Sequence, residues 1–126
     1  MRKRHGVSGI FFSMDEGDLQ RIVLDENAVI GTDGVVPNLT TPTHPRGMAS
    51  FPKAIRYFVR EKKLLTLEEM IRKMTSMPAA VYGLKKKGLI REGMDADLCI
   101  FHRENILDRA EFAACRNPNQ GLHYVV

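Results

Sequence analysis

Residues 7–34 read VSGIFFSMDEGDLQRIVLDENAVIGTDG, and this stretch decides the predicted fold. Its two ends, 7–12 and 28–32, are short apolar runs rich in branched and aromatic side chains, which is typical of buried strands. Between them, Ser13 and Glu16 have the spacing of a capping box, which predicts the start of a helix. The order strand, helix, strand is typical of a βαβ unit with two parallel strands.

A long irregular segment follows the second apolar run. Pro37, Pro42 and Pro45 interrupt any regular strand or helix before Phe51. Loops of this length are uncommon in compact domains and are often functional. We therefore expect this loop to carry functional side chains.

Three helices are predicted after the loop. Phe51 begins an amphipathic pattern with Pro52 in the first turn, where proline is tolerated. Thr66 begins the sequence TLEE, which repeats the capping-box pattern and predicts a second helix. A third, short helix is expected to begin near Pro78 and to end at Gly83, since glycine readily adopts the left-handed conformation that follows a helix.

The tail of the chain has a different pattern. A turn-rich stretch leads to a predicted strand over 96–101, and a second strand-like run covers 121–126. The region 102–115 has no clear periodicity. We therefore predict two domains, residues 1–87 and residues 88–126.

Length and composition limit the possible classes of protein. The chain has 126 residues, of which 44% are hydrophobic and 27% charged, so it is neither a disordered chain nor a collagen or coiled coil. It is too short for a complete (β/α)8 barrel, which needs about 200 residues or more. Cys99 and Cys115 lie outside metal-ligand spacings, and no apolar run reaches the roughly 18 residues of a membrane span. With no signal-type cleavage site, the expected compartment is the cytoplasm.

The net charge is +4, and part of the excess comes from two basic clusters, RKR at 2–4 and KKK at 85–87. Such clusters can attract nucleic acid. The sequence has no zinc-finger spacing, aromatic stacking signature or helix-turn-helix pattern beside them. This favours solvated surface charge, with nucleic-acid binding as the alternative.

Asp33 is the first candidate functional residue. It directly follows the predicted strand at 28–32 and begins the proline-rich loop. The carboxyl ends of strands are where α/β proteins place reactive groups. The alternative is a hairpin turn formed by Asp33 and Gly34. The residues that follow do not resume a strand pattern, which argues against a hairpin, but on spacing alone both interpretations of Asp33 stay open.

Six motifs then follow one another in order along the chain. They are IGTDG at 30–34, THPR at 43–46, SFP at 50–52, LLTLEEMIRKMTSMPAAVYGL at 64–84, GLI at 88–90 and GMDAD at 93–97. This series resembles the C-terminal portion of the N-acyl-D-amino-acid deacylases, or D-aminoacylases, of the amidohydrolase superfamily. The last motif alone is typical of amidohydrolases in general, whereas the complete series points to the deacylase branch.

The resemblance implies a fold. The family fold is a metal-bearing (β/α)8 barrel with a small β-sandwich. Residues 7–12 would match the seventh barrel strand, 28–32 the eighth, 51–83 the closing helices, and 96–126 the small β domain. The expected fold class is therefore α/β, with the last two strands and closing helices of a partial (β/α)8 barrel followed by a small β segment.

The resemblance also implies roles for individual residues. Asp33 would be the catalytic general base, which takes a proton from the attacking water and passes it to the leaving amine. Arg46 would bind the substrate carboxylate, which suits its planar guanidinium, although a surface ion pair is the alternative. His44 would help to bind the substrate by positioning the loop. Thr32 replaces the serine usual in the family, and the sequence GMAS at 47–50 departs from the family pattern.

The resemblance implies zinc in the complete family enzyme, but this chain has no HxH pair or other metal-ligand spacing. Its histidines and cysteines are His5, His44, Cys99, His102, Cys115 and His123. We therefore expect no metal ligands and no cofactor in this chain, and no activity from the chain alone.

The expected function is that of a D-aminoacylase-like fragment, related to metal-dependent hydrolysis of the linear amide of N-acyl-D-amino acids. Two strands alone form a narrow sheet with unpaired edges, so we expect either a second copy or a complementing barrel chain as partner. The alternatives are a non-catalytic self-associating module and, less favoured, a basic nucleic-acid-binding domain. No membrane partner is expected.

Overall fold

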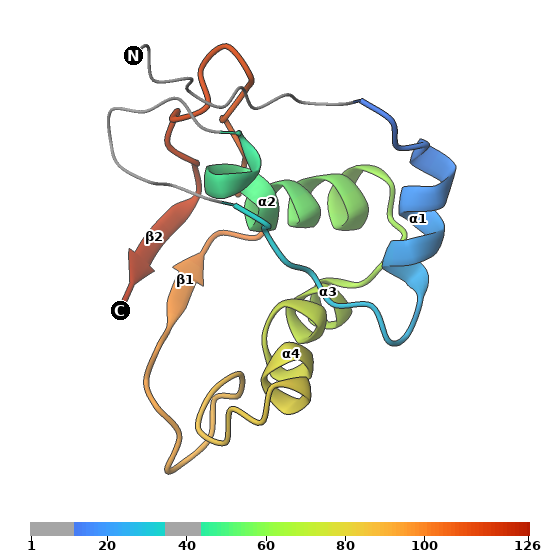
Figure 1. Cartoon of the computed structure of the whole chain (residues 1–126). Coiled ribbons are helices and arrows are strands. Elements are labelled where there is room, and N and C mark those ends of the chain that lie inside the picture. Colours follow the sequence, from blue (N-terminus) through green and yellow to red (C-terminus); the bar gives the residue numbers. More distant parts are fainter. Residues whose placement is uncertain (1–11, 35–43) are drawn as a thin grey trace, which may run out of the picture.

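The computed structural model describes residues 12–34 and 44–126 of the chain. Its elements in chain order are α1 (Glu16–Leu24), α2 (Arg46–Ala54), the π-helix η1 (Ile55–Glu61), α3 (Leu67–Met74), α4 (Ser76–Val81), β1 (Cys99–Phe101) and β2 (Leu122–Val125). Figure 1 shows α2 and its continuation η1 at the centre, with α1 on one side, α3 and α4 below, and the two strands on the other side. The described part is a mixed α/β structure in which helices predominate.

Helix α1 begins later than the sequence predicts. Its N-cap is Asp15, whose carboxylate accepts a hydrogen bond of 3.1 Å from the Asp18 N–H. Ser13, the predicted cap, therefore lies before the helix. Aspartate caps as well as serine does, and its negative charge also suits the positive end of the helix dipole, which explains the difference.

The strand predicted over 28–32 is not formed. This segment has no regular secondary structure, and it belongs to no sheet among the residues that the structure describes. The Ile30 N–H instead donates to the carbonyl oxygen of Lys73, in the last turn of α3, at 3.1 Å. A strand needs the backbone of a neighbouring strand, and here a helix provides the acceptor. The other predicted strand, 7–12, lies outside the described residues except for Phe12, which is exposed.

Helix α2 begins at Arg46, before the predicted start at Phe51, so Pro52 lies inside the helix. Proline has no N–H to donate to the carbonyl of Met48, four residues earlier. The side-chain amide of Asn119 donates to that carbonyl oxygen instead, at 2.6 Å. A distant side chain therefore replaces the missing backbone donor, which allows the helix to continue through the proline.

Helices α3 and α4 follow the predicted pattern. The Thr66 hydroxyl accepts a hydrogen bond of 3.2 Å from the Glu69 N–H, which confirms Thr66 as the N-cap of α3. The Glu69 carboxylate pairs with Arg72 at 2.7 Å, so the second half of the capping box is not made. Gly83 follows α4 with φ of +68°, as predicted for the end of that helix. No helix within 12–34 or 44–126 is long and apolar enough to cross a membrane.

Strands β1 and β2 form a two-stranded antiparallel sheet in which Cys99 lies opposite Val125. Leu98 and Val126 extend the pairing with two backbone hydrogen bonds, of 2.8 and 3.0 Å. The two strands predicted in the tail are confirmed, although both are shorter than expected. A second layer of a β-sandwich is not present among the described residues.

The core lies between the central helix and its neighbours. It includes Ile106, from the loop after β1, which is 2% exposed, so part of the tail shares a core with the helices. The buried residues of this cluster are Val23, Ala54, Ile55, Phe58, Val59, Met70 and Ile106. The central helix is therefore covered by α1, α3 and the segment that follows β1. The domain boundary near residue 87 stays a prediction.

A buried ion pair joins the tail to η1. The Arg56 guanidinium contacts the Asp108 carboxylate through Nε at 2.5 Å and through Nη2 at 3.2 Å. Its Nη1 contacts Glu61 at 2.6 Å. The side chains of Arg56 and Asp108 are 22% and 10% exposed. This two-point contact fixes the loop after β1 against the central helix.

Opposed effects act on the pKa values of this pair. Burial by itself would raise the pKa of the Asp108 carboxyl, but the hydrogen bonds and positive charge of Arg56 hold it below its ordinary value. The hydrogen bonds that Arg56 donates to Asp108 likewise raise the pKa of Arg56 above its ordinary value, although burial opposes this shift. Both groups are therefore charged at neutral pH.

Candidate functional site

The structure brings two of the predicted site residues into contact. Asp33 directly follows the segment 28–32, and Arg46 is the first residue of α2. The Arg46 Nη2 lies 2.9 Å from the Asp33 Oδ2. The two side chains are 45% and 86% exposed. The candidate site is therefore an open ion pair at the start of α2, with solvent around both charged groups.

The backbone at Asp33 turns in a way that favours this contact. Its φ is +44°, in the left-handed region, which aspartate adopts more readily than most residues do. The Thr32 hydroxyl accepts a hydrogen bond of 3.2 Å from the Gly34 N–H and closes the turn. The serine that is usual in the family also has a hydroxyl, so Thr32 can make the same local hydrogen bond that serine would make.

Two glycines allow the turn to approach α2. A Cβ atom on Gly34 would lie 2.5 Å from the Cα of Gly47, which is closer than atoms can come without a backbone shift. Because Gly47 is the residue after Arg46, this approach places Asp33 next to the arginine. The sequence indicates Gly34 only as a turn residue and Gly47 only as a departure from the family pattern, so their contact was not predicted.

His44 binds the backbone at the start of α2, next to the N-cap residue Pro45. Its Nδ1 accepts a hydrogen bond of 3.1 Å from the Arg46 N–H, and its carbonyl accepts one of 3.1 Å from the Gly47 N–H. The ring packs edge-on against Phe112, with ring centres 5.0 Å apart. The Ser50 hydroxyl donates to the Arg46 carbonyl at 2.8 Å. His44 therefore holds the backbone that carries Arg46.

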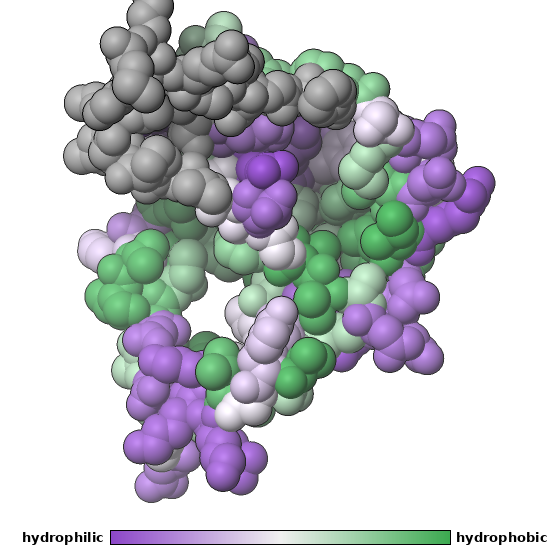
Figure 2. All heavy atoms as spheres, viewed as in Figure 1, coloured by the Kyte–Doolittle hydropathy of each residue, from purple (hydrophilic) through white to green (hydrophobic). Residues whose placement is uncertain are grey.

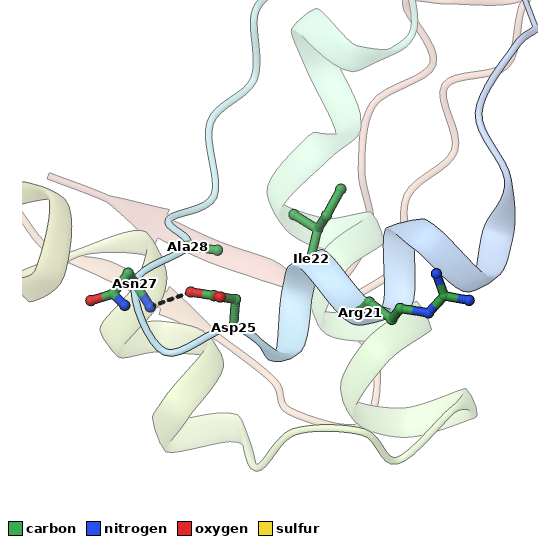
Figure 3. A pocket seen from close by; sticks show the side chains of 5 residues that line it. All are labelled: Arg21, Ile22, Asp25, Asn27 and Ala28. Atoms are coloured by element: carbon green, nitrogen blue, oxygen red, sulfur yellow. Dashed lines mark hydrogen bonds between the residues drawn. The ribbon is translucent and has the colours of Figure 1, made fainter.

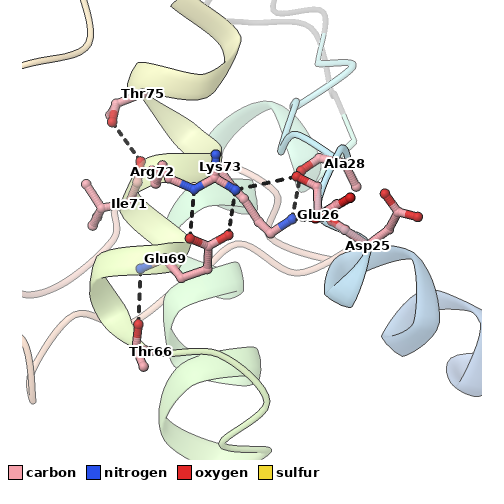
Figure 4. Close-up of polar contacts among 9 residues, drawn as sticks. All are labelled: Asp25, Glu26, Ala28, Thr66, Glu69, Ile71, Arg72, Lys73 and Thr75. Carbon is pink, nitrogen blue, oxygen red and sulfur yellow. Dashed lines mark hydrogen bonds and ion pairs between the residues drawn. The ribbon is translucent and has the colours of Figure 1, made fainter.

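Lys73 anchors the chain that leads to Asp33, a role that the sequence does not predict. Its side chain is 1% exposed, and its Nζ donates to the carbonyl oxygens of Asp25 and Ala28, the latter at 3.0 Å (Figure 4). Its own carbonyl accepts the Ile30 N–H. One residue of α3 thus binds the backbone of the segment before Asp33 at three positions. No local pattern marks this lysine, because charged residues in amphipathic helices are usually exposed.

A shallow pocket lies beside α1, away from the residues of the ion pair. Its lining residues are Arg21, Ile22, Asp25, Asn27 and Ala28 (Figure 3). The carboxylate of Asp25 accepts a hydrogen bond of 2.8 Å from the Asn27 N–H, so it is used within the turn. The pocket contains neither Asp33 nor Arg46.

The site residues do not fit a zinc centre. Within the described ranges no group of three or more histidine, cysteine, aspartate or glutamate side chains is placed to hold a metal ion. Asp33 is paired with Arg46, and the Nδ1 of His44 accepts a hydrogen bond from the Arg46 N–H. The Asp33 carboxylate can accept a proton, and the Arg46 guanidinium can bind an anion.

Sequence comparisons agree with the predicted resemblance. Residues 25–126 match the amidohydrolase family. The chain is 43% identical over 119 residues to an N-acyl-D-aspartate deacylase of Alcaligenes xylosoxydans xylosoxydans, a match that covers 94% of this chain and 24% of that protein. It is 39% identical over 120 residues to an N-acyl-D-glutamate deacylase of the same organism, covering 95% of this chain and 24% of that protein. The chain thus spans about a quarter of the length of these relatives.

Solved structures give the same result. A D-aminoacylase described as defining a novel subset of amidohydrolases superposes with a TM-score of 0.84 and 34% identity, over 90% of this chain and 23% of that one. An N-acyl-D-glutamate deacylase from Bordetella bronchiseptica, complexed with zinc and a phosphonate inhibitor, superposes with a TM-score of 0.83 and 34% identity over the same shares. The predicted resemblance to the N-acyl-D-amino-acid deacylases is confirmed.

Proposed function

Because this chain belongs to the amidohydrolase family, we propose that it is the part of an N-acyl-D-amino-acid deacylase that supplies the general base and the carboxylate-binding arginine. The reaction would be hydrolysis of the linear amide of an N-acyl-D-amino acid. The names and identities of the relatives support this choice of substrate class.

Asp33 and Arg46 would have different roles in this reaction. The Asp33 carboxylate would take a proton from the attacking water and then pass it to the nitrogen of the leaving amine. The Arg46 guanidinium would bind the carboxylate of the substrate, for which a planar fork of N–H donors is well shaped. His44 would contribute by fixing the backbone of Arg46, since its ring accepts a hydrogen bond from the Arg46 N–H.

The observation that carries this proposal is the contact between Asp33 and Arg46. The resemblance assigns them two different roles on the same substrate, which requires them to lie close together. The 2.9 Å distance between their side chains meets that requirement, and their exposure leaves space for a ligand. Zinc would have to be held by residues outside those described here, so the proposed steps use only the side chains of this chain.

The same proposal includes the arrangement of the fold. Residues 7–12 and 28–32 would occupy the positions of the last two strands of a (β/α)8 barrel, 51–83 those of its closing helices, and 88–126 part of a small β-sandwich. The apolar pattern of 28–32 supports this view. Its backbone would pair as a strand only when a neighbouring strand is supplied.

Exposed apolar side chains support the need for a partner. Figure 2 shows apolar surface over the strands and beside α1. In the sheet, Tyr124 and Val125 are 66% and 75% exposed, and on α1 Ile22 is 54% exposed. Monomeric proteins seldom leave so much apolar surface uncovered. A complementing barrel chain would cover it, and the chain alone would be inactive.

A non-catalytic, self-associating module is the second candidate. The two-stranded sheet favours it, because a sheet this narrow is marginal in water and both of its outer edges are unpaired among the described residues. Nucleic-acid binding is less favoured. Lys87, in the basic cluster 85–87, pairs with Asp95 at 2.9 Å and also with Asp97, which neutralises part of that cluster.

A segment replacement tests the proposed function. The chain would replace the matching quarter of the N-acyl-D-aspartate deacylase, and hydrolysis of an N-acyl-D-aspartate would be measured. We expect an active enzyme that loses about 10²–10⁴-fold in kcat on Asp33→Asn, as expected for loss of a general base. Arg46→Gln should chiefly raise KM.

Asp18→Asn is the matched control for this experiment, because it removes one exposed carboxylate that pairs with Arg21 at 2.6 Å, away from the site. It should leave hydrolysis unchanged. Full activity of the Asp33→Asn enzyme would contradict the role of Asp33. The isolated chain, supplied with zinc, should hydrolyse no N-acyl-D-amino acid.

A further inference from the structure

On the premise of the proposed function, we propose that Asp33 and Arg46 form an exchangeable ion pair. In the free chain, Asp33 occupies the place on Arg46 that the carboxylate of a ligand would take. Binding of a carboxylate ligand would therefore displace Asp33 and release its carboxylate from the arginine. Ligand binding and release of the general base would be one event.

The first reason is the form of the contact. Asp33 reaches Arg46 through one oxygen and one terminal nitrogen, Oδ2 and Nη2. A guanidinium can bind a carboxylate through two parallel N–H···O bonds, and Arg56 binds Asp108 in this way. Asp33 therefore engages only one terminal nitrogen of Arg46, whereas a free carboxylate can make the stronger two-point contact.

The second reason is exposure. Both partners of the pair are in contact with solvent, and the Asp33 side chain is 86% exposed. An exposed ion pair lowers the apparent affinity of a competing ligand by less than about fivefold, because water solvates the separated charges well. The pair is thus strong enough to be occupied in the free chain and weak enough to be replaced.

The third reason is that only side chains need to move. The backbone of Arg46 is held by the Nδ1 of His44 and by the Ser50 hydroxyl. The backbone at Asp33 is held by the close approach of Gly34 to Gly47. Arg46 also stands at the positive end of α2, which favours any incoming anion. Exchange therefore leaves the frame of the site intact.

The exchange predicts selectivity. A ligand with a carboxylate replaces Asp33 on the arginine, so the base is released to a greater extent when such a ligand is present. An amide of the same size and no charge cannot replace it, and Asp33 stays paired. This distinction would be built into the ion pair itself.

Titration of the isolated chain tests the exchange. N-acetyl-D-alanine is the probe, N-acetyl-D-alaninamide is the ligand without a carboxylate, and binding is followed by chemical-shift changes at the start of α2. We expect Asp33→Asn to bind N-acetyl-D-alanine about two- to fivefold more tightly than the natural chain, because the internal competitor is lost. Arg46→Gln should abolish binding, and the alaninamide should bind no variant.

The matched control is again Asp18→Asn, which removes the same charge and a comparable exposed ion pair but leaves Arg46 untouched. It should bind N-acetyl-D-alanine as the natural chain does. An equal gain in affinity in Asp18→Asn would show that net charge, and not exchange, is responsible, and would overturn the proposal.

Failure of the exchange and failure of the proposed function give different results. If Arg46→Gln abolishes binding but Asp33→Asn binds no more tightly than the natural chain, the exchange is wrong and the role of Arg46 stands. If Arg46→Gln binds as the natural chain does, the role of Arg46 is wrong as well. If neither the natural chain nor Asp33→Asn binds the probe, the exchange is overturned, and segment replacement decides the function separately.

Discussion

Two arginine–aspartate pairs join distant parts of this chain, and they differ in almost every physical respect. Arg56 and Asp108 meet through two hydrogen bonds and are mostly buried. Arg46 and Asp33 meet through one contact and are largely exposed. The same two side-chain types thus form a mostly buried pair that joins two parts of the fold in one place, and an open, exchangeable contact in the other. Burial and the number of contacts, and not the residue types, make the difference.

The largest loss of stability is expected when the pair between Arg56 and Asp108 is broken. Arg56→Met leaves the Asp108 carboxylate, 10% exposed, without its main partner, and this should lower the free energy of unfolding by about 2–3 kcal/mol. Arg46→Met is the matched variant in the exposed pair and should lower it by less than about 1 kcal/mol. Urea melts followed by circular dichroism measure both. Equal losses in the two variants would contradict the contrast between the pairs.

The buried pair should also make stability depend on pH. Arg56 holds the pKa of folded Asp108 below its ordinary value, although burial alone would raise it. The stabilisation is therefore complete above the ordinary aspartate pKa of about 3.9, and it is lost as the pH falls through the folded value. Urea melts over this acid range should show a shallower fall in stability for Asp108→Asn than for the natural chain. Arg56→Met should behave in the same way, and an unchanged slope in both variants would refute this origin.

A smaller effect is expected at the start of α2, near the exposed pair. Asn119→Ala removes the donor to the Met48 carbonyl, and we expect a loss of about 1–2 kcal/mol in the free energy of unfolding. Pro52→Ala supplies a backbone N–H that can reach the same carbonyl. Asn119→Ala should therefore cost less in the Pro52→Ala background. Equal costs in the two backgrounds, measured by thermal or urea unfolding, would argue against the assigned role of Asn119.

The smallest effect is expected for Asp33→Asn. This change removes the exposed ion pair but keeps a side chain that tolerates the left-handed φ of +44°. The free energy of unfolding should fall by less than about 1 kcal/mol. A loss of 2 kcal/mol or more would make Asp33 a structural residue and would count against an exchangeable pair. Together with Arg56→Met, this variant measures how much more the mostly buried pair stabilises the fold than the exposed pair does.

Local features were predictable because the groups that make them lie close together in the sequence. Thr66 caps a helix through a residue three positions away, and Gly83 ends one through its own backbone. The predicted cap at Ser13 was wrong for an equally local reason, since Asp15 offers a competing carboxylate. The strand at 28–32 failed because a strand depends on a neighbour that the apolar pattern cannot supply.

The sequence by itself determined the family, the helices that follow the loop, the two strands of the tail, and Asp33, His44 and Arg46 as the residues to examine. Only the tertiary structure decided that Lys73 is buried as an anchor and that Asn119 compensates for Pro52 by donating to Met48, 71 residues away along the chain. It also decided which arginine pair is buried. The physical reason is that capping and hydrophobic periodicity act over one or two turns of chain, whereas burial and long-range hydrogen bonds depend on the path of the whole chain.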